Sequence, residues 1–281
     1  MKKLILIVSV MLLGAVFALF FTGCDSGSGN DDASQSINIV LSDDEVEISG
    51  DGAEFESRQL TITQPGVYNI SGSLSNGRIV VDVARDERVE LVMTDVSITS
   101  AQSAVLHVID AERVFLTIPE GSTTTFTDAE RYVFAPGANG RPHSAIYSRR
   151  SITIRGGGTL NVNGNFHNGI WSRGSVRIQN STVNVTAPNN GIRGRNSVRI
   201  TNSTFDINAG NHGIRVTREN DPDRGFVLIE DSSGNIRAGD DGIRVITDVN
   251  IRGSNVTISA RGWFIMNQGE QNIEEGNVVF N

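Results

Sequence analysis

A polar pair, a small residue and an isoleucine occur together five times between residues 143 and 243. The copies are His143-Ser144-Ala145-Ile146, His167-Asn168-Gly169-Ile170, Asn189-Asn190-Gly191-Ile192, Asn211-His212-Gly213-Ile214 and Asp240-Asp241-Gly242-Ile243. Their isoleucines are 24, 22, 22 and 29 residues apart. A period of this length is typical of solenoids, in which each repeat buries its apolar face only against its neighbours.

Each repeat also contains two short runs in which apolar and polar residues alternate. Ser175–Ile178 and Thr182–Val185 are one such pair, and Gly, Asn and Pro separate the runs. This alternation predicts strands with one buried face, and units this short leave no room for a helical crossover. We therefore predict an all-β chain that folds as a single-stranded right-handed parallel β-helix of about 22 residues per coil.

The expected domain covers residues 37–281. Its most regular coils are predicted at 141–262, and fainter alternating runs before residue 140 predict further coils of the same stack. The last step, of 29 residues, contains the polar insertion Thr217–Gly225, which a solenoid can hold as a loop. Residues 263–281 depart from the repeat and are predicted to be a terminal cap, in which Trp263 to Met266 cover the last coil.

The N-terminus carries an export signal. Met1-Lys2-Lys3 precedes an apolar stretch that ends in Phe21-Thr22-Gly23-Cys24, and Cys24 is the single cysteine of the chain. We predict a lipoprotein-type signal peptide at 1–23, lipidation of Cys24, and a flexible Ser/Gly/Asp-rich tether at 24–36. The protein is then exported and lipid-anchored at the cell envelope. An uncleaved membrane anchor is the alternative, since about 18 apolar residues can just span a bilayer.

Charge is divided unevenly along the chain. Residues 25–140 hold 20 Asp and Glu against 6 Arg, whereas residues 141–262 hold 9 acidic residues against 16 Arg. A basic half on a protein of net charge −8 indicates an anionic partner. Nucleic acid is not expected outside the cytoplasm, so an acidic polysaccharide, lipopolysaccharide or an acidic protein surface is the expected partner.

The residue after each repeated isoleucine suggests where that partner binds. These residues are Tyr147, Trp171, Arg193, Arg215 and Arg244, called here the outer column. Aromatic faces stack on sugar rings, and Arg binds carboxylates through two parallel hydrogen bonds, so the set would suit a uronic-acid polymer lying along the stack. In the alternative interpretation the arginines pair with local acids such as Asp206 or Asp240, and Trp171 covers the core.

The chain resembles the bacterial extracellular carbohydrate-binding β-helix proteins, which are related in fold to pectate lyases. The resemblance runs from about residue 37 to 262 and is carried by the following stretches: Val67–Leu74, Ile79–Asp82, Thr159–Gly164, Gly169-Ile170, Gly191-Ile192 and Ala238–Ile243. It implies a parallel β-helix that binds polysaccharide rather than cleaving it. It also implies Ca²⁺ held by acidic residues in the Asp-Gly-Ile turns.

This sequence keeps both carboxylates in one turn only, at Asp240 and Asp241. Because Ca²⁺ takes six to eight oxygen ligands, we expect at most one weak site, formed by Asp240, Asp241 and Asn211. The Asn-rich turns also have a purely structural interpretation, because stacked amides can hydrogen-bond from coil to coil.

Three classes of function stay open. The favoured class is a tethered, non-catalytic polysaccharide-binding protein, and the second is a structural or adhesive solenoid with an envelope or protein partner. The third is a Ca²⁺-dependent polysaccharide lyase. Lys occurs only at positions 2 and 3, which leaves Arg215 or Arg244, near Asp240 and Asp241, as the conceivable base.

Overall fold

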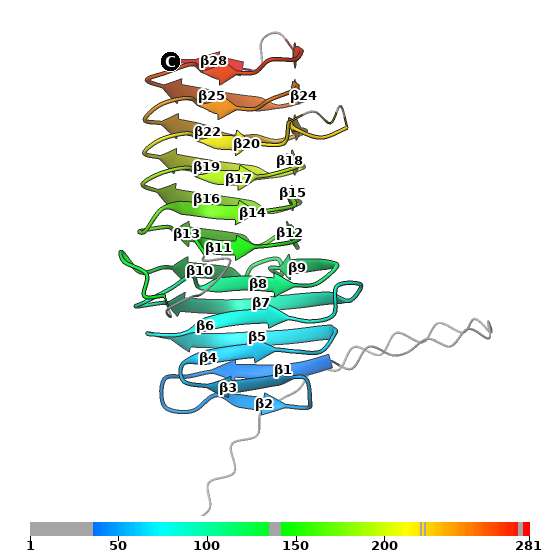
Figure 1. Cartoon of the computed structure of the whole chain (residues 1–281), viewed down its shortest axis with the longest axis vertical. Coiled ribbons are helices and arrows are strands. Elements are labelled where there is room, and N and C mark those ends of the chain that lie inside the picture. Colours follow the sequence, from blue (N-terminus) through cyan, green and yellow to red (C-terminus); the bar gives the residue numbers. More distant parts are fainter. Residues whose placement is uncertain (1–35, 135–141, 220, 222, 275–277) are drawn as a thin grey trace, which may run out of the picture. The chain divides into compact units, whose positions relative to one another are not determined.

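The computed structural model describes residues 36–134, 142–219, 221, 223–274 and 278–281 (Figure 1). These residues contain 28 β-strands and no helix, and most strand pairs are parallel. The prediction of an all-β chain of mainly parallel strands is confirmed. The predicted signal peptide at 1–23, Cys24 and nearly all of the tether at 24–36 lie outside the described residues. Within the described ranges, no helix is long and apolar enough to span a bilayer.

One sheet has ten strands and consists of the strands that carry the repeated isoleucines, together with their counterparts earlier and later in the chain. They are β3 (Ala53–Glu56), β4 (Gln59–Ile62), β6 (Arg78–Asp82), β8 (Leu106–Asp110), β11 (Ser144–Ser148), β14 (Asn168–Ser172), β17 (Ile192–Gly194), β20 (Ile214–Val216), β23 (Ile243–Arg244) and β26 (Ile265–Met266).

The second sheet has eighteen strands, which form a long row and a short row joined by the twelve-residue strand β7. The long row is β1 (Ser36–Leu41), β2 (Glu47–Ser49), β5 (Gly66–Leu74), β7 (Arg88–Thr99), β10 (Thr123–Thr127), β13 (Thr159–Asn163), β16 (Thr182–Ala187), β19 (Thr204–Ala209), β22 (Ser233–Ala238), β25 (Asn255–Ala260) and β28 (Val278–Phe280). The short row is β9 (Arg113–Thr117), β12 (Ser151–Arg155), β15 (Ser175–Gln179), β18 (Ser197–Thr201), β21 (Phe226–Glu230), β24 (Val249–Arg252) and β27 (Gln271–Ile273).

Each repeat is one layer of a stack, and the repeated isoleucines lie in one column. Ile146 pairs with Ile170, and this parallel pairing continues through Ile192 and Ile214 to Ile243. All five side chains are fully buried. The alternating runs of the other two rows bury their apolar residues in the same core, for example Val176 under Val198 and Val183 under Phe205. The Thr217–Gly225 insertion lies between β20 and β21, outside the regular strands.

The small residue of each copy is required by the packing. A Cβ added to Gly169, Gly191, Gly213 or Gly242 would come within 2.2–2.3 Å of a methyl group of a core Val or Ile. It would also lie 2.6–2.8 Å from a backbone oxygen of the next layer. The glycines therefore let the turn approach the core closely enough for the isoleucine column to form.

The two ends of the stack differ. At the start, β2 and β3 pair antiparallel with β1 and β4. At the other end, the described part of the predicted cap keeps the strand pairing of the repeat. There β26, β27 and β28 pair in parallel with β23, β24 and β25, so they form one more layer.

The residues predicted to cover the last coil are only partly buried. Trp263 is 69% exposed and Met266 is 38% exposed, whereas Ile265 continues the isoleucine column. Phe264 occupies the position that glycine holds in earlier layers and stacks on Phe280 at 5.1 Å between ring centroids. A large side chain fits at this position because no further layer of described residues lies beyond it.

Replacing Gly213 with Ala is expected to destabilise the protein by about 1–3 kcal/mol, because the new methyl group must displace Ile236 or the backbone of Gly242. Urea unfolding followed by circular dichroism measures the change. Ala145→Gly is the reciprocal control, since Ala stands at the same position of the first copy, and it should cost on the order of 1 kcal/mol through backbone entropy. An unchanged midpoint for Gly213→Ala would contradict the packing argument.

Candidate functional site

The outer column lies on the ten-stranded sheet, and its residues come from β11, β14, β17, β20 and β23. Tyr147 pairs with Trp171, Trp171 with Arg193, Arg193 with Arg215, and Arg215 with Arg244. Each follows a buried isoleucine, so each side chain points to the opposite face of the sheet, away from the core. Side chains that are 97 residues apart in sequence are therefore brought into one line.

Tyr147 differs from the expectation that every member of the outer column can meet a ligand. Its side chain is only 2% exposed. The ring packs between His107, at 5.3 Å, and Trp171, at 5.0 Å, as measured between ring centroids. His107 comes from β8, a strand of the irregular first half of the chain, and it pairs with Tyr147. Tyr147 therefore supports Trp171 and does not face solvent.

Trp171 and Arg193 form the next contact in the outer column. The Arg193 guanidinium carbon lies 4.6 Å from the centroid of the Trp171 ring, which is the geometry of a cation–π interaction. Burial, with a smaller contribution from the positive charge of Arg215, lowers the pKa of Arg193. Its Nε is buried and has no hydrogen-bond partner among the described residues. The aromatic and cationic parts of the column thus form one continuous surface.

Among the residues that the structure describes, Arg244 has a carboxylate partner, whereas Arg215 does not. Arg244 donates from Nη1 to Asp241 Oδ2 at 3.1 Å. Arg215 has no carboxylate within ion-pair distance in the part of the chain that the structure describes, and burial, followed by the Arg244 charge, lowers its pKa. Asp206, the other acid considered as a local partner, is bound by Arg237 at 2.7 Å. Local pairing therefore accounts for Arg244 but not for Arg193 or Arg215.

The polar pairs of the repeats form two further columns. The inner one contains Asn168, Asn190, His212 and Asp241, all buried. Asn190 Nδ2 donates to Asn168 Oδ1 at 2.6 Å. In the outer one, Asn211 Nδ2 donates to Asn189 Oδ1 at 2.9 Å, and Asn189 contacts the His167 ring. The structural interpretation of the Asn-rich turns required hydrogen bonds between stacked amides, and the two contacts between Asn side chains are such bonds.

Two of the three predicted metal ligands, Asp240 and Asp241, lie together, and His212 joins them in place of Asn211. His212, Asp240 and Asp241 each have a ligating atom within 4.8 Å of the others, whereas the Asn211 amide nitrogen is directed to Asn189. The Asp241 backbone N–H donates to His212 Nδ1 at 3.4 Å. Burial is the main cause that lowers the pKa of His212, and its Nδ1 lies 3.5 Å from Asp241 Oδ2.

This donor set does not fit Ca²⁺ well. Both oxygens of Asp241 are already engaged, because Oδ2 accepts from Arg244 and Oδ1 accepts from the Trp263 backbone N–H at 2.9 Å. Asp240 is exposed and adds one carboxylate. Two carboxylates, one of them held by a guanidinium, fall short of the six to eight oxygens that Ca²⁺ takes.

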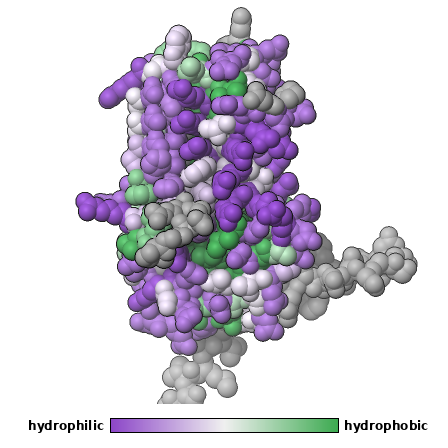
Figure 2. All heavy atoms as spheres, viewed as in Figure 1, coloured by the Kyte–Doolittle hydropathy of each residue, from purple (hydrophilic) through white to green (hydrophobic). Residues whose placement is uncertain are grey.

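An aromatic cluster next to Trp171 was not predicted from the sequence. Phe166 stacks on Tyr132 at 4.3 Å and lies 6.0 Å from His143, whose ring is 6.1 Å from Trp171. Figure 2 shows hydrophobic side chains at about the level of β8 and β11, with hydrophilic side chains dominating the layers beyond them. The position of Phe166, directly before the polar pair His167-Asn168, could have predicted an aromatic ring near Trp171. Tyr132 could not be placed in this way, because it lies outside the regular repeats.

Four of the five residues of the outer column belong to a stretch of the sequence that is poor in carboxylates. Residues 131–218 contain twelve Arg and one acidic residue, Asp206. Asp206 is held by Arg237 from a later layer, and acids from outside the stretch pair with Arg150, Arg155 and Arg218. Arg193 and Arg215 have no such partner among the described residues. The charge count over residues 141–262 did not show this shortage of carboxylates, because eight of the nine acidic residues in that range lie after residue 218.

Comparison with known proteins gives consistent results. A family model described as "Carbohydrate-binding domain-containing protein" matches residues 56–277. A protein of that description from Acetivibrio thermocellus is 36% identical over 276 residues, covering 98% of this chain and 96% of its own length. A solved structure, described as the polysaccharide lyase-like protein from C. thermocellum in a gadolinium derivative, superposes with a TM-score of 0.84. It is 37% identical and covers 88% of this chain and 100% of its own. The chain therefore belongs to the family of carbohydrate-binding domain-containing proteins.

Proposed function

We propose that this protein binds an acidic, uronic-acid-containing polysaccharide without cleaving it. The polymer lies along Trp171, Arg193, Arg215 and Arg244, with Tyr147 supporting the column from within. In this proposal the stacked layers are coils of a single-stranded right-handed parallel β-helix, with about 22 residues in a regular coil.

One observation carries the proposal. Arg193 and Arg215 are neighbours in register, next to a partly exposed Trp171, and neither has a carboxylate partner among the described residues. Like charges one layer apart, about 4.8 Å, repel each other unless an anion lies alongside. Carboxylates of a uronic-acid polymer would supply such anions at successive layers, and each could accept two hydrogen bonds from a guanidinium.

The proposed location follows from the N-terminal sequence. An exported chain with lipid on Cys24 and a tether at 24–36 would display the stack at the cell envelope, where polysaccharide is available. The structural or adhesive solenoid remains an outcome of the binding test. Retention by an envelope protein, with no retention by any polysaccharide, would favour it.

Replacing Arg215 with Gln is expected to weaken binding to polygalacturonate roughly three- to tenfold, since an exposed charge pair contributes on the order of 1 kcal/mol. Isothermal titration at two salt concentrations measures this, and binding should weaken as salt rises. Arg261→Gln is the matched control, because Arg261 is exposed, directly follows β25 and borders a hollow lined by Asn208, Arg237 and Ser259, none of which belongs to the ten-stranded sheet. Fully methyl-esterified pectin should bind weakly to all variants. Equal affinity for the esterified and the free-acid polymer would contradict the proposal that the protein recognises an acidic polysaccharide.

Removing Ca²⁺ is expected to change polygalacturonate affinity less than twofold, because both Asp241 oxygens are already engaged. The measurement compares binding in chelator with binding in millimolar CaCl₂, alongside direct Ca²⁺ titration of the protein alone. Weak Ca²⁺ binding that disappears in Asp240→Asn would support the predicted site at Asp240 and Asp241. Affinity that collapses in chelator would instead make Ca²⁺ essential to glycan binding.

A lyase activity has one feature in its favour, namely that burial and Arg244 lower the pKa of Arg215, as a general base would need. We expect no activity, since the nearby Asp241 is held by Arg244. Absorbance of unsaturated product from polygalacturonate with added Ca²⁺ measures it. A rise that is lost in Arg215→Gln but kept in Arg261→Gln would reverse this expectation.

A further inference from the structure

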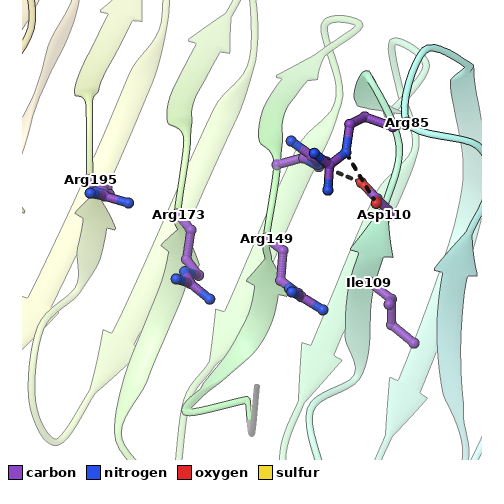
Figure 3. A pocket seen from close by; sticks show the side chains of 7 residues that line it. Arg85, Ile109, Asp110, Arg149, Arg173 and Arg195 are labelled. Atoms are coloured by element: carbon purple, nitrogen blue, oxygen red, sulfur yellow. Dashed lines mark hydrogen bonds and ion pairs between the residues drawn. The ribbon is translucent and has the colours of Figure 1, made fainter. Parts of the chain in front are cut away.

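A second line of arginines, called here the corner row, runs beside the outer column. Arg149, Arg173 and Arg195 lie just beyond the ends of β11, β14 and β17, one in each of three successive layers (Figure 3). The Arg173 backbone N–H donates to Ser148 O at 2.8 Å, and the Arg195 N–H donates to Ser172 O at 2.9 Å. These bonds fix the three residues at equivalent places in the stack. All three are exposed.

The corner row borders an open hollow of 250 Å³ that is also lined by Arg85, Ile109, Asp110 and Arg150. Asp110 is the single carboxylate in this lining, and it is already neutralised. Arg150 Nε lies 2.5 Å from Asp110 Oδ1, and Arg85 Nε lies 3.6 Å from Asp110 Oδ2. The hydrogen bond from Arg150 is the largest cause that lowers the pKa of this carboxyl. Five arginines therefore share one internal anion.

The three arginines of the corner row have no carboxylate within ion-pair distance among the described residues. The stretch that contains them, residues 131–218, offers only Asp206, which Arg237 holds. Some arginines elsewhere in the stack are paired, as Arg88 is with Glu112 and Arg252 with Glu230. The positive charge of the corner row is thus left for an anion from outside the described chain.

The corner row lies close to the outer column in each of its three layers. Arg149, Arg173 and Arg195 follow Tyr147, Trp171 and Arg193 by two residues, in the bends just beyond the strand ends. Arg149 is also close enough to His107, the neighbour of Tyr147, to contribute to its low pKa of about 4, after burial and Arg78. One ligand can therefore contact both lines of residues.

We propose that the corner row and its hollow form a second anion-binding site, which takes successive carboxylate or sulfate groups of a linear acidic polysaccharide. One cation per layer, at about 4.8 Å, suits a polymer that carries one anionic group on each sugar ring. The fork of a guanidinium can bind a carboxylate or a sulfate through two hydrogen bonds. This proposal rests on the proposed polysaccharide-binding function and adds a second contact line to it.

The test uses the full chain and four variants: Arg173→Gln, Arg195→Gln, Arg215→Gln and the control Arg261→Gln. The probes are oligogalacturonate, dextran sulfate and neutral dextran, titrated at two salt concentrations. We expect Arg173→Gln and Arg195→Gln each to weaken binding of an acidic probe about three- to tenfold and to reduce its salt dependence. Arg261→Gln and neutral dextran should show no such change. The preference between carboxylate and sulfate identifies which anion the row takes.

The outcomes separate this inference from the proposed function. Loss of affinity in Arg215→Gln alone would overturn the corner row and leave the outer column standing. Loss in Arg173→Gln and Arg195→Gln alone would support the corner row and overturn the outer column. No loss in any variant would overturn both. Thermal midpoints within about 2 °C of the unmodified chain show that a loss is not caused by unfolding.

Discussion

Hydrogen bonds between equivalent residues of successive layers hold the rest of this structure in place. The isoleucine backbone N–H groups of four consecutive layers, from Ile170 to Ile243, each donate to the next layer at 2.9–3.0 Å. Such a ladder forms only if each turn approaches the core closely, and the glycine before each isoleucine makes that approach possible. Because the layers repeat in register, a residue type that recurs at one position becomes a line on the surface.

That constraint also concentrates charge. Residues 131–218 contain twelve arginines and a single carboxylate. The stack places five of these arginines in two lines, Arg193 and Arg215 in the outer column and Arg149, Arg173 and Arg195 in the corner row. The two resulting lines, the outer column and the corner row, lie beside a cluster of aromatic rings around Trp171 and Phe166. Rings that suit sugar faces and guanidinium groups that suit anions thus lie close together in the stack.

The sequence predicted best what depends on the period alone. The isoleucine column, the buried alternation of β15 and β16 and the order of the outer column all follow from equal spacing. Features set by unlike neighbours could not be predicted in this way. Tyr147 is buried because His107 lies next to it, and His107 belongs to a part of the chain where the period is faint.

The same limit applies to the acidic turn and to the last layer. Adjacent carboxylates in sequence gave no indication that Arg244 and the Trp263 backbone would occupy both oxygens of Asp241. Residues 263–281 looked irregular because Phe264 replaces the usual glycine, although their strands keep the register. The corner row did follow the period, at spacings of 24 and 22 residues, and could have been found by examining every position of the repeat.

The two identical steps of 22 residues between Ile170, Ile192 and Ile214 have an evolutionary consequence. A layer bonded only to the layers on either side is a modular unit, so duplication or loss of one such segment leaves the remaining joints intact. Duplication of residues 193–214 would add one guanidinium to each line, through Arg193 and Arg195. The length of the charged surface is therefore open to adjustment in whole steps, without redesign of the fold.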